Sequence, residues 1–87
     1  MNKKSTISLM NNLLDRITIS SQVCDGQPVI RGMRITVKTI LDYLAAGEAT
    51  ENILKAYPKL EKEDIQACLQ FASRTLERRI YAFELAS

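Results

Sequence analysis

The chain has 87 residues, of which 46% are hydrophobic, and twelve basic against ten acidic residues give a net charge of +2. This length allows one domain with a small core, and the ordinary apolar fraction excludes a chain that is disordered throughout. The small net charge excludes a general attraction to nucleic acid, so any such contact must come from local clusters of basic residues.

Cysteine and histidine usage argues against a metal or disulfide framework. Cys24 and Cys68 lie far apart, and the chain has no histidine, so the ligand spacing of a zinc site is missing. We interpret both cysteines as reduced and structural, as is usual in the cytoplasm. No apolar run approaches the length of a membrane span or a secretory signal. We therefore expect a cytoplasmic protein with no cofactor, metal or membrane contact.

Residues 1–15 form an N-terminal extension with two possible uses. Apolar residues recur at helical spacing after Lys3 and Lys4, namely Leu9, Met10, Leu13 and Leu14. One interpretation is an amphipathic helix packed on the domain or its partner. The other is a mobile arm whose lysines touch phosphate. We favour packing, because lysines are common at exposed termini.

A small β unit is expected next. Arg16–Ser20 alternates apolar and polar residues, as a short strand does. Pro28 steers Gln27 into an extended conformation, and beyond it four of the five odd positions from 29 to 37 are apolar, which is the spacing of one face of a strand. The positions between them are mixed, so we predict a short, turned β element over Val29–Ile35 from which Arg31 and Arg34 project. Gly26 and Gly32 are the positions where the chain is expected to turn.

Three helices are predicted after this unit. Thr36 is placed to cap a helix over Val37–Ala46, which Gly47 ends. Thr50 is placed to cap the second, which Pro58 ends. The third begins near Glu61 and meets no glycine or proline up to the last residue.

The predicted apolar faces are Val37, Ile40, Leu41 and Leu44 in the first helix; Ile53, Leu54 and Tyr57 in the second; and Ile65, Cys68, Leu69, Ala72, Leu76, Ile80 and Phe83 in the third. A third helix of about 25 residues reaches about 40 Å, which exceeds a small three-helix core. We expect it to project from Arg74 onward. The predicted fold is mainly α: a three-helix helix-turn-helix core (homeodomain-like or winged) with a short N-terminal β element and an extended C-terminal helix.

Three ordered motifs carry a family resemblance: Asp25-Gly26-Gln27-Pro28-Val29-Ile30-Arg31-Gly32-Met33-Arg34-Ile35, then Ala46-Gly47, then Tyr57-Pro58-Lys59-Leu60. Over about residues 16–73 the chain resembles the bacterial family called "domain of unknown function 433". The resemblance implies a small helix-turn-helix protein, an antitoxin that accompanies a toxin resembling a PIN-type ribonuclease. The domain would then span residues 16–73, and residues 74–87 would be the projecting helix.

Four positions depart from that family's pattern. Asp25 and Gln27 stand where the pattern has glycine and lysine, so this loop is less basic. Met33 and Glu61 each stand where it has threonine. The structural turn positions carried by the motifs and helix ends are Gly26, Pro28, Gly32, Gly47 and Pro58.

DNA contact is expected through the β unit rather than the third helix. The start of the third helix, Glu61–Gln66, has three carboxylates against one lysine, and these acids repel phosphate. They also suit the positive end of a helix. Gln66 is the residue there that can read adenine. The candidate DNA-binding residues are therefore Arg16, Arg31, Arg34, Lys38 and Gln66. The alternative is that Arg31 and Arg34 pair with carboxylates such as Asp25 or Asp42.

The projecting helix is the candidate surface for a protein partner. Its candidate residues are Arg74, Leu76, Arg78, Arg79, Ile80 and Phe83. Self-association, with a dimer as the expected form, is one use of this helix. The competing interpretation is that it bends back onto Leu9–Leu14.

No catalytic constellation is recognisable, since no nucleophile has a base at a familiar spacing, and we predict that the chain is not an enzyme. The resemblance implies an antitoxin that neutralises a PIN-like ribonuclease and binds operator DNA to regulate its own operon. The alternative is a protein-interaction or dimerisation module that does not bind DNA.

Overall fold

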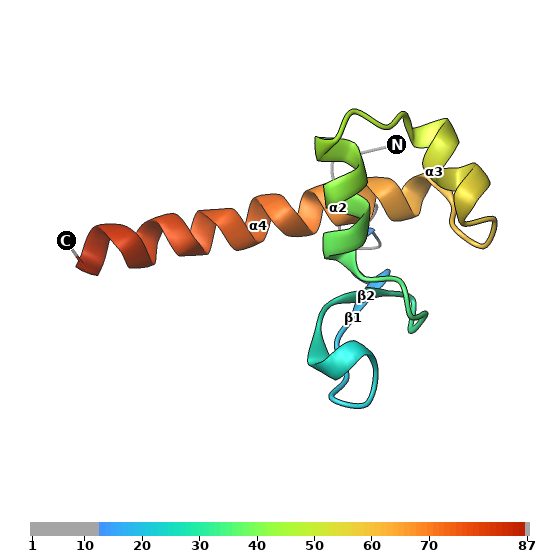
Figure 1. The fold of residues 1–87 in the computed structure, drawn as a ribbon. Coiled ribbons are helices and arrows are strands. Elements are labelled where there is room, and N and C mark those ends of the chain that lie inside the picture. Colours follow the sequence, from blue (N-terminus) through green and yellow to red (C-terminus); the bar gives the residue numbers. More distant parts are fainter. Residues whose placement is uncertain (1–12, 87) are drawn as a thin grey trace, which may run out of the picture.

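The computed structural model describes residues 13–86, with side chains as far as Arg78 (Figure 1). Its elements, in chain order, are β1 (Ile17–Thr18), the short 3-10 helix η1 (Cys24–Gly26), β2 (Val29–Ile30), α2 (Val37–Ala45), α3 (Thr50–Ala56) and α4 (Lys62–Ala86). The predicted fold class is confirmed: three main helices follow a short two-stranded β element. Lys3, Lys4, Leu9 and Met10 of the predicted N-terminal helix lie outside the described residues.

The two strands pair antiparallel, with Ile17 opposite Ile30 and Thr18 opposite Val29. Beyond Ile30 the chain turns, as predicted for a short, turned β element with a reversal at Gly32. Arg31 and Gly32 both have positive φ, at 47° and 72°, and they turn the chain back on itself. The Ile30 amide then donates to the Ile35 carbonyl at 3.1 Å. The β element is therefore short and turned, and its second strand ends at Ile30.

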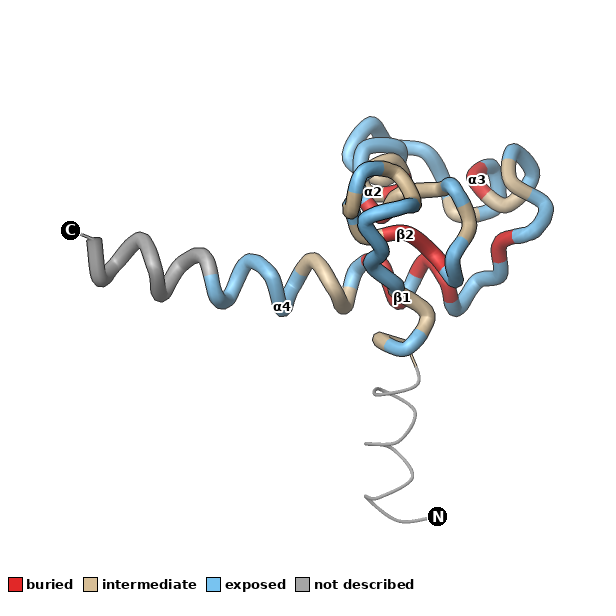
Figure 2. The backbone as a smooth tube through the Cα atoms, turned by 90° about the horizontal axis from the view of Figure 1, so that it is seen from below, coloured by how far each residue is buried: buried red, intermediate tan, exposed pale blue. Residues whose placement is uncertain are grey.

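The β2 strand lies at the centre of the molecule rather than at its surface. Val29 and Ile30 are both buried, with 1% and 0% of their surface exposed. Figure 2 shows this buried strand between β1 and the helices. The β element therefore leans on the helical core, as expected for a two-stranded unit that is marginal alone.

The first helix is capped and ended as predicted, and the second begins at Thr50 as predicted but has a different cap residue. The Thr36 hydroxyl accepts a hydrogen bond from the Thr39 amide at 3.1 Å, so Thr36 caps α2. Gly47, at φ +91°, follows the end of this helix. The prediction that Thr50 caps the second helix is wrong. Ala49 already has the extended conformation of a cap residue, and Thr50 is the first helical residue.

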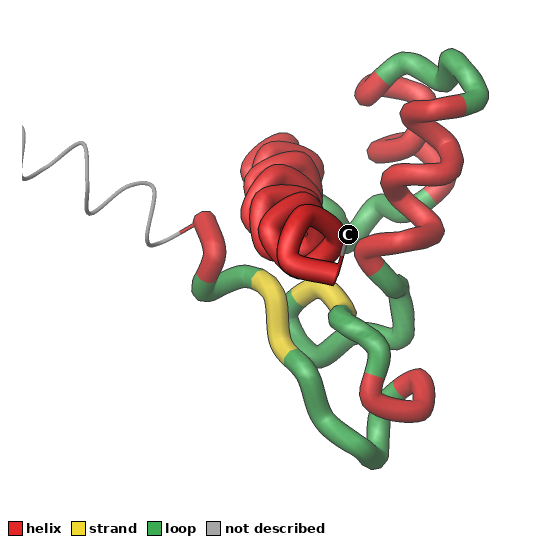
Figure 3. The backbone as a smooth tube through the Cα atoms, turned by 90° about the vertical axis from the view of Figure 1, so that its left-hand side faces the viewer, coloured by secondary structure: helices red, strands yellow, loops and turns green. Residues whose placement is uncertain are grey.

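Figure 3 looks along α4, with α2 and α3 on one side of it and β1 on the other. The buried core is formed by Ile30, Val37, Ile40, Ile53, Leu60, Ile65 and Cys68. One part of the predicted α4 face is wrong, because Leu69 is 51% exposed, whereas the 60% exposure of Leu76 agrees with a helix that projects from Arg74 onward. The buried face of α4 includes Asp64 and Ala67 instead, because α4 turns that side toward α2 and the β element.

The second half of α4 leaves the domain (Figure 1). The helix continues without a break from Lys62 to Ala86, but Phe71 and Ala72 are half-buried and every residue from Ser73 to Arg78 is exposed. The predicted projection is therefore seen. Within residues 13–86, no helix is both long enough and apolar enough to cross a membrane.

Candidate functional site

Asp64 is the centre of the most connected polar cluster in the structure. It lies in the first turn of α4, and its side chain is fully buried. Among the described residues it is the one buried charged side chain. A buried carboxylate is costly unless it is paired and hydrogen-bonded, so its contacts decide whether this position is stable.

Arg31 supplies two of those contacts. Its Nε donates to Asp64 Oδ1 at 3.1 Å and its Nη2 to Asp64 Oδ2 at 2.8 Å, which is the bidentate geometry of a guanidinium on a carboxylate. Nη2 also donates to the Lys59 carbonyl at 2.9 Å. The turn at Arg31–Gly32 is what directs this side chain from the end of β2 toward α4.

Arg16 binds the same carboxylate from β1's side. Its Nη1 donates to Asp64 Oδ1 at 3.0 Å and to Glu61 Oε1 at 2.7 Å. The Arg16 carbonyl accepts the Arg31 amide at 2.7 Å, so the two arginines are joined through the backbone as well. Arg16, just before β1, and Arg31, just after β2, thereby attach both strands to the first turn of α4.

The helix itself supplies the last hydrogen bond. The backbone amide of Glu61 donates to Asp64 Oδ2 at 2.8 Å, which satisfies one of the free amides at the start of α4. A negative charge in the first turn is also favoured by the helix dipole. We call Arg16, Arg31, Glu61 and Asp64 the Asp64 clamp.

The clamp keeps Asp64 ionised. Burial by itself raises the pKa of this carboxyl, but the hydrogen bonds from Arg31, the Glu61 amide and Arg16 together lower the pKa below its ordinary value. One turn later, burial and then the charge of Asp64 raise the pKa of the Cys68 thiol to about 12. This thiol is therefore protonated at neutral pH and is a poor nucleophile.

The predicted basic cluster does not form one free patch. Arg16 and Arg31 belong to the clamp, and Lys38 pairs with Asp42 on the surface of α2 at 2.8 Å. Arg34 is exposed and makes no ion pair with residues 13–78. The internal-pairing alternative thus holds for Arg31, although its partner is Asp64 rather than Asp25 or Asp42.

The remaining predicted DNA-binding residue lies elsewhere. Gln66 is exposed on α4, in a groove beside α3. The sequence analysis missed Asp64 as an organising residue. An acid in the first turn of a helix was a recognisable capping signal, but nothing in the sequence indicated that both arginines would meet it.

The predicted partner-binding residues of α4 lie in two different grooves. Arg74 and Arg78 line a groove of about 390 Å³ between β1 and α4. Leu76 lines a groove of about 460 Å³ between α2 and α4. The side chains of Arg79, Ile80 and Phe83 lie outside the part that the structure describes.

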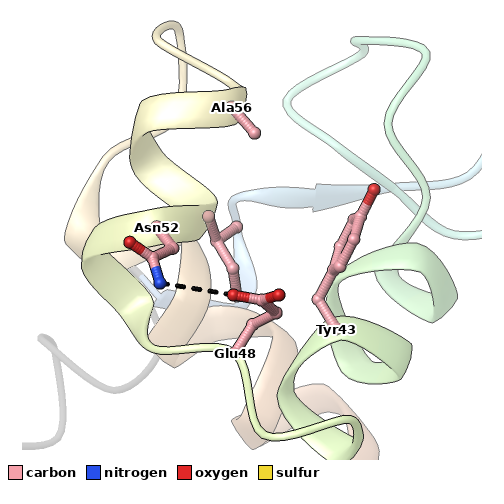
Figure 4. A pocket seen from close by; sticks show the side chains of 5 residues that line it. Tyr43, Glu48, Asn52 and Ala56 are labelled. Carbon is pink, nitrogen blue, oxygen red and sulfur yellow. Dashed lines mark hydrogen bonds between the residues drawn. The ribbon is translucent and has the colours of Figure 1, made fainter.

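A smaller hollow lies between α2 and α3 (Figure 4). It has a volume of about 140 Å³ and is lined by Tyr43, Glu48, Asn52, Ile53 and Ala56. The Asn52 amide donates to Glu48 Oε1 at 3.3 Å across its mouth. The hollow is below the roughly 300 Å³ at which ligand pockets begin. Within residues 13–86, no group of three or more histidine, cysteine or acidic side chains is placed to hold a metal.

Comparisons with known proteins agree on the family. The family described as "Protein of unknown function (DUF433)" matches residues 17–72. An uncharacterized protein of Sinorhizobium fredii, y4eO, is 36% identical over 56 residues, which are 64% of this chain and 25% of that protein. The crystal structure of a DUF433 member from Anabaena variabilis matches with a TM-score of 0.68 and 29% sequence identity. The match covers 100% of this chain and 100% of that chain. The chain thus spans about a quarter of the curated relative it matches.

Proposed function

The chain belongs to the DUF433 family, and from this premise we propose that it is an antitoxin-like protein that binds and silences a PIN-like ribonuclease. The observation that carries the proposal is the projecting helix α4, which leaves the domain with its described side chains exposed. A helix extended in this way is suited to lie along a partner's surface.

The groove between β1 and α4 supports this choice of partner. Arg74 and Arg78 are one helical turn apart in it, and neither makes an ion pair with the described residues. Ile17 and Ile19 of the same groove add apolar surface, and Ile19 is 62% exposed. A PIN-like ribonuclease is expected to have an acidic, metal-binding cleft, and arginine pairs strongly with carboxylates. Occupying that cleft, or its approach, blocks the RNA substrate.

Two forms of the proposal differ in whether operator DNA is also bound. Autoregulation through DNA would use Arg34 and Lys38, the two basic residues of the predicted cluster outside the Asp64 clamp. The interaction module without DNA binding has the stronger support. Arg16 and Arg31 already pair with Asp64, and the start of α4 carries the exposed acids Glu61 and Glu63.

The test replaces Arg74, Arg78 and Arg79 with alanine together and measures inhibition of the PIN-like ribonuclease of the same operon in an RNA-cleavage assay. We expect inhibition to weaken by at least about tenfold, the effect of losing one good charge-assisted contact. The matched control replaces Lys55, Lys59 and Lys62 with alanine, which removes the same charge from exposed sites on and around α3 and the start of α4. Unchanged inhibition by the arginine variant, or equal loss in the control, would contradict the proposal.

A further inference from the structure

The groove between α2 and α4 differs in character from the one that holds Arg74 and Arg78. Its floor and walls are mostly apolar, with Pro28, Val37 and Leu41 on one side and Phe71 and Leu76 on the other. Its volume of about 460 Å³ leaves room for more than one apolar side chain of a docked helix. Exposed apolar surface of this kind marks a binding surface in a small soluble domain.

The same surface presents both a projection and a hollow. Leu76 stands at the edge of the groove with 60% of its surface exposed, although it is a large apolar side chain. Across a twofold axis, each copy's Leu76 can enter the other copy's groove, because such an interface uses the same patch on both partners. A twofold interface needs a self-complementary patch, and Leu76 beside the groove gives this patch both a projecting side chain and a hollow.

The charges at the rim are also self-complementary. Lys38 and Asp42 line the groove one helical turn apart on α2, and their Nζ and Oδ2 atoms are 2.8 Å apart. The rim therefore carries one cation and one anion. A second copy in antiparallel orientation meets each with its opposite, whereas a strongly acidic partner gains little from a rim whose two charges sum to zero. The groove with Arg74 and Arg78 has no acid in its lining and suits an acidic partner instead.

We propose that the α2–α4 groove is the docking site for a second copy of this chain, with Leu76 as the central contact and Lys38 and Asp42 pairing between copies. This inference goes beyond the proposed neutralising function and does not depend on it. The two grooves adjoin on α4, where Phe71 and Thr75 line both, but Arg74 and Arg78 line only the groove beside β1.

The first test compares two exposed leucines on the same helix. Leu76→Lys places a charge in the centre of the proposed contact, while Leu69→Lys makes the same change at a residue that is 51% exposed in a different groove, beside α3. Sedimentation equilibrium over a range of concentrations measures the dimer dissociation constant. We expect Leu76→Lys to raise it by roughly thirtyfold or more, as for a central interface residue. Leu69→Lys is expected to leave it within about threefold, because exposed positions outside the contact contribute little.

The second test reverses one charge at a time. K38D chains carry two acids at the rim and D42K chains carry two bases, so each should dimerise more weakly than the unaltered chain. When the two are mixed, opposite rims meet, and native mass spectrometry should show the mixed dimer in excess over either homodimer. Both residues are on the surface, with side chains 75% and 63% exposed, so folding should be retained.

The unaltered chain remaining monomeric at every concentration would overturn the proposal. So would dissociation by Leu69→Lys but not Leu76→Lys, or mixing of K38D and D42K chains without preference. Circular dichroism confirms that each variant is folded. Ribonuclease inhibition is measured separately, so loss of dimerisation and failure of the neutralising function give different results.

Discussion

At the scale of single residues, Asp64 explains the positions of Arg16 and Arg31, of which Arg31 belongs to the family motif. A carboxylate with none of its surface exposed needs partners for its oxygens. Arg31, Arg16 and the Glu61 amide supply four hydrogen bonds between them. Their geometry makes these arginines structural residues that attach the β element to the start of α4.

Replacing Asp64 with asparagine tests this role. The change keeps the size of the side chain but removes the charge that both arginines bind. We expect the free energy of unfolding to fall by about 2 kcal/mol. This is less than for a fully buried ion pair, because the arginine side chains are partly exposed. Urea unfolding followed by circular dichroism measures it. The control Asp42→Asn removes an exposed pair and should cost at most about 0.5 kcal/mol. Equal costs in the two variants would refute the clamp.

The same variant carries a pH signature. The pKa of Asp64 is lowered in the folded state from its ordinary value of 3.8, so near that pH the unfolded chain binds more protons than the folded one. The stability from Asp64 is therefore fully present above 3.8 and lost as pH falls through the folded pKa. The difference in unfolding free energy between the unaltered chain and Asp64→Asn should be constant around neutral pH and shrink as the pH falls below 3.8. A difference that grows on acidification would show that the pKa is raised instead.

At the scale of elements, the turn at Arg31–Gly32 sets the direction of the clamp. Two successive residues with positive φ reverse the chain between Ile30 and Ile35 and direct Arg31 at α4. Arginine tolerates this conformation poorly, so the ion pair with Asp64 has to offset the strain. The turn and the clamp thus depend on one another.

Gly32→Ala measures the backbone requirement without a steric clash. A Cβ at this position meets nothing within 4 Å, but φ is +72°, so we expect a loss of about 1–2 kcal/mol from strain alone. Gly32→Asn is the control, because asparagine enters the left-handed region more readily, and it should lose clearly less. Thermal unfolding compares the two. An equal or larger loss for asparagine would mean that side-chain size, not backbone conformation, decides this position.

At the scale of the whole molecule, the distribution of charge supports the proposal of a protein partner more than that of operator DNA. The net charge is only +2, and two of the four basic residues in the predicted cluster lie in the Asp64 clamp. The acids Glu61 and Glu63 are exposed at the start of α4. Arg74 and Arg78 on the projecting helix are exposed and make no ion pair with the described residues.

Fluorescence anisotropy with the chain's own upstream DNA and a scrambled duplex, at low and physiological salt, tests this balance. We expect weak and equal binding to both at low salt that is lost at physiological salt, as for contacts to phosphate alone. Arg34→Ala should weaken that residual binding to both duplexes alike. A preference for the upstream DNA that persists at physiological salt would instead establish a regulator and assign the contact to Arg34 and Lys38.

Local signals in the sequence were enough for the helices and their ends. Thr36 caps α2 and Gly47 ends it, Pro58 follows α3, and α4 continues uninterrupted, because caps, glycine and proline act within a few residues. One local prediction was wrong, because Ala49 rather than Thr50 is the cap residue of α3. A prediction that depends on packing was also wrong, since Leu69, placed on the predicted apolar face of α4, is 51% exposed.

What the sequence by itself determined is therefore the set of helices, their order, and a third helix longer than the core it packs on. These follow from periodicity and backbone preferences that each residue carries with it. Only the tertiary structure decided where the arginines go, because Arg16 and Arg31 meet Asp64 across 48 and 33 positions of the chain. It also decided that Arg74 and Leu76 lie in different grooves. Such pairings depend on how the elements pack, and no spacing along the sequence records that.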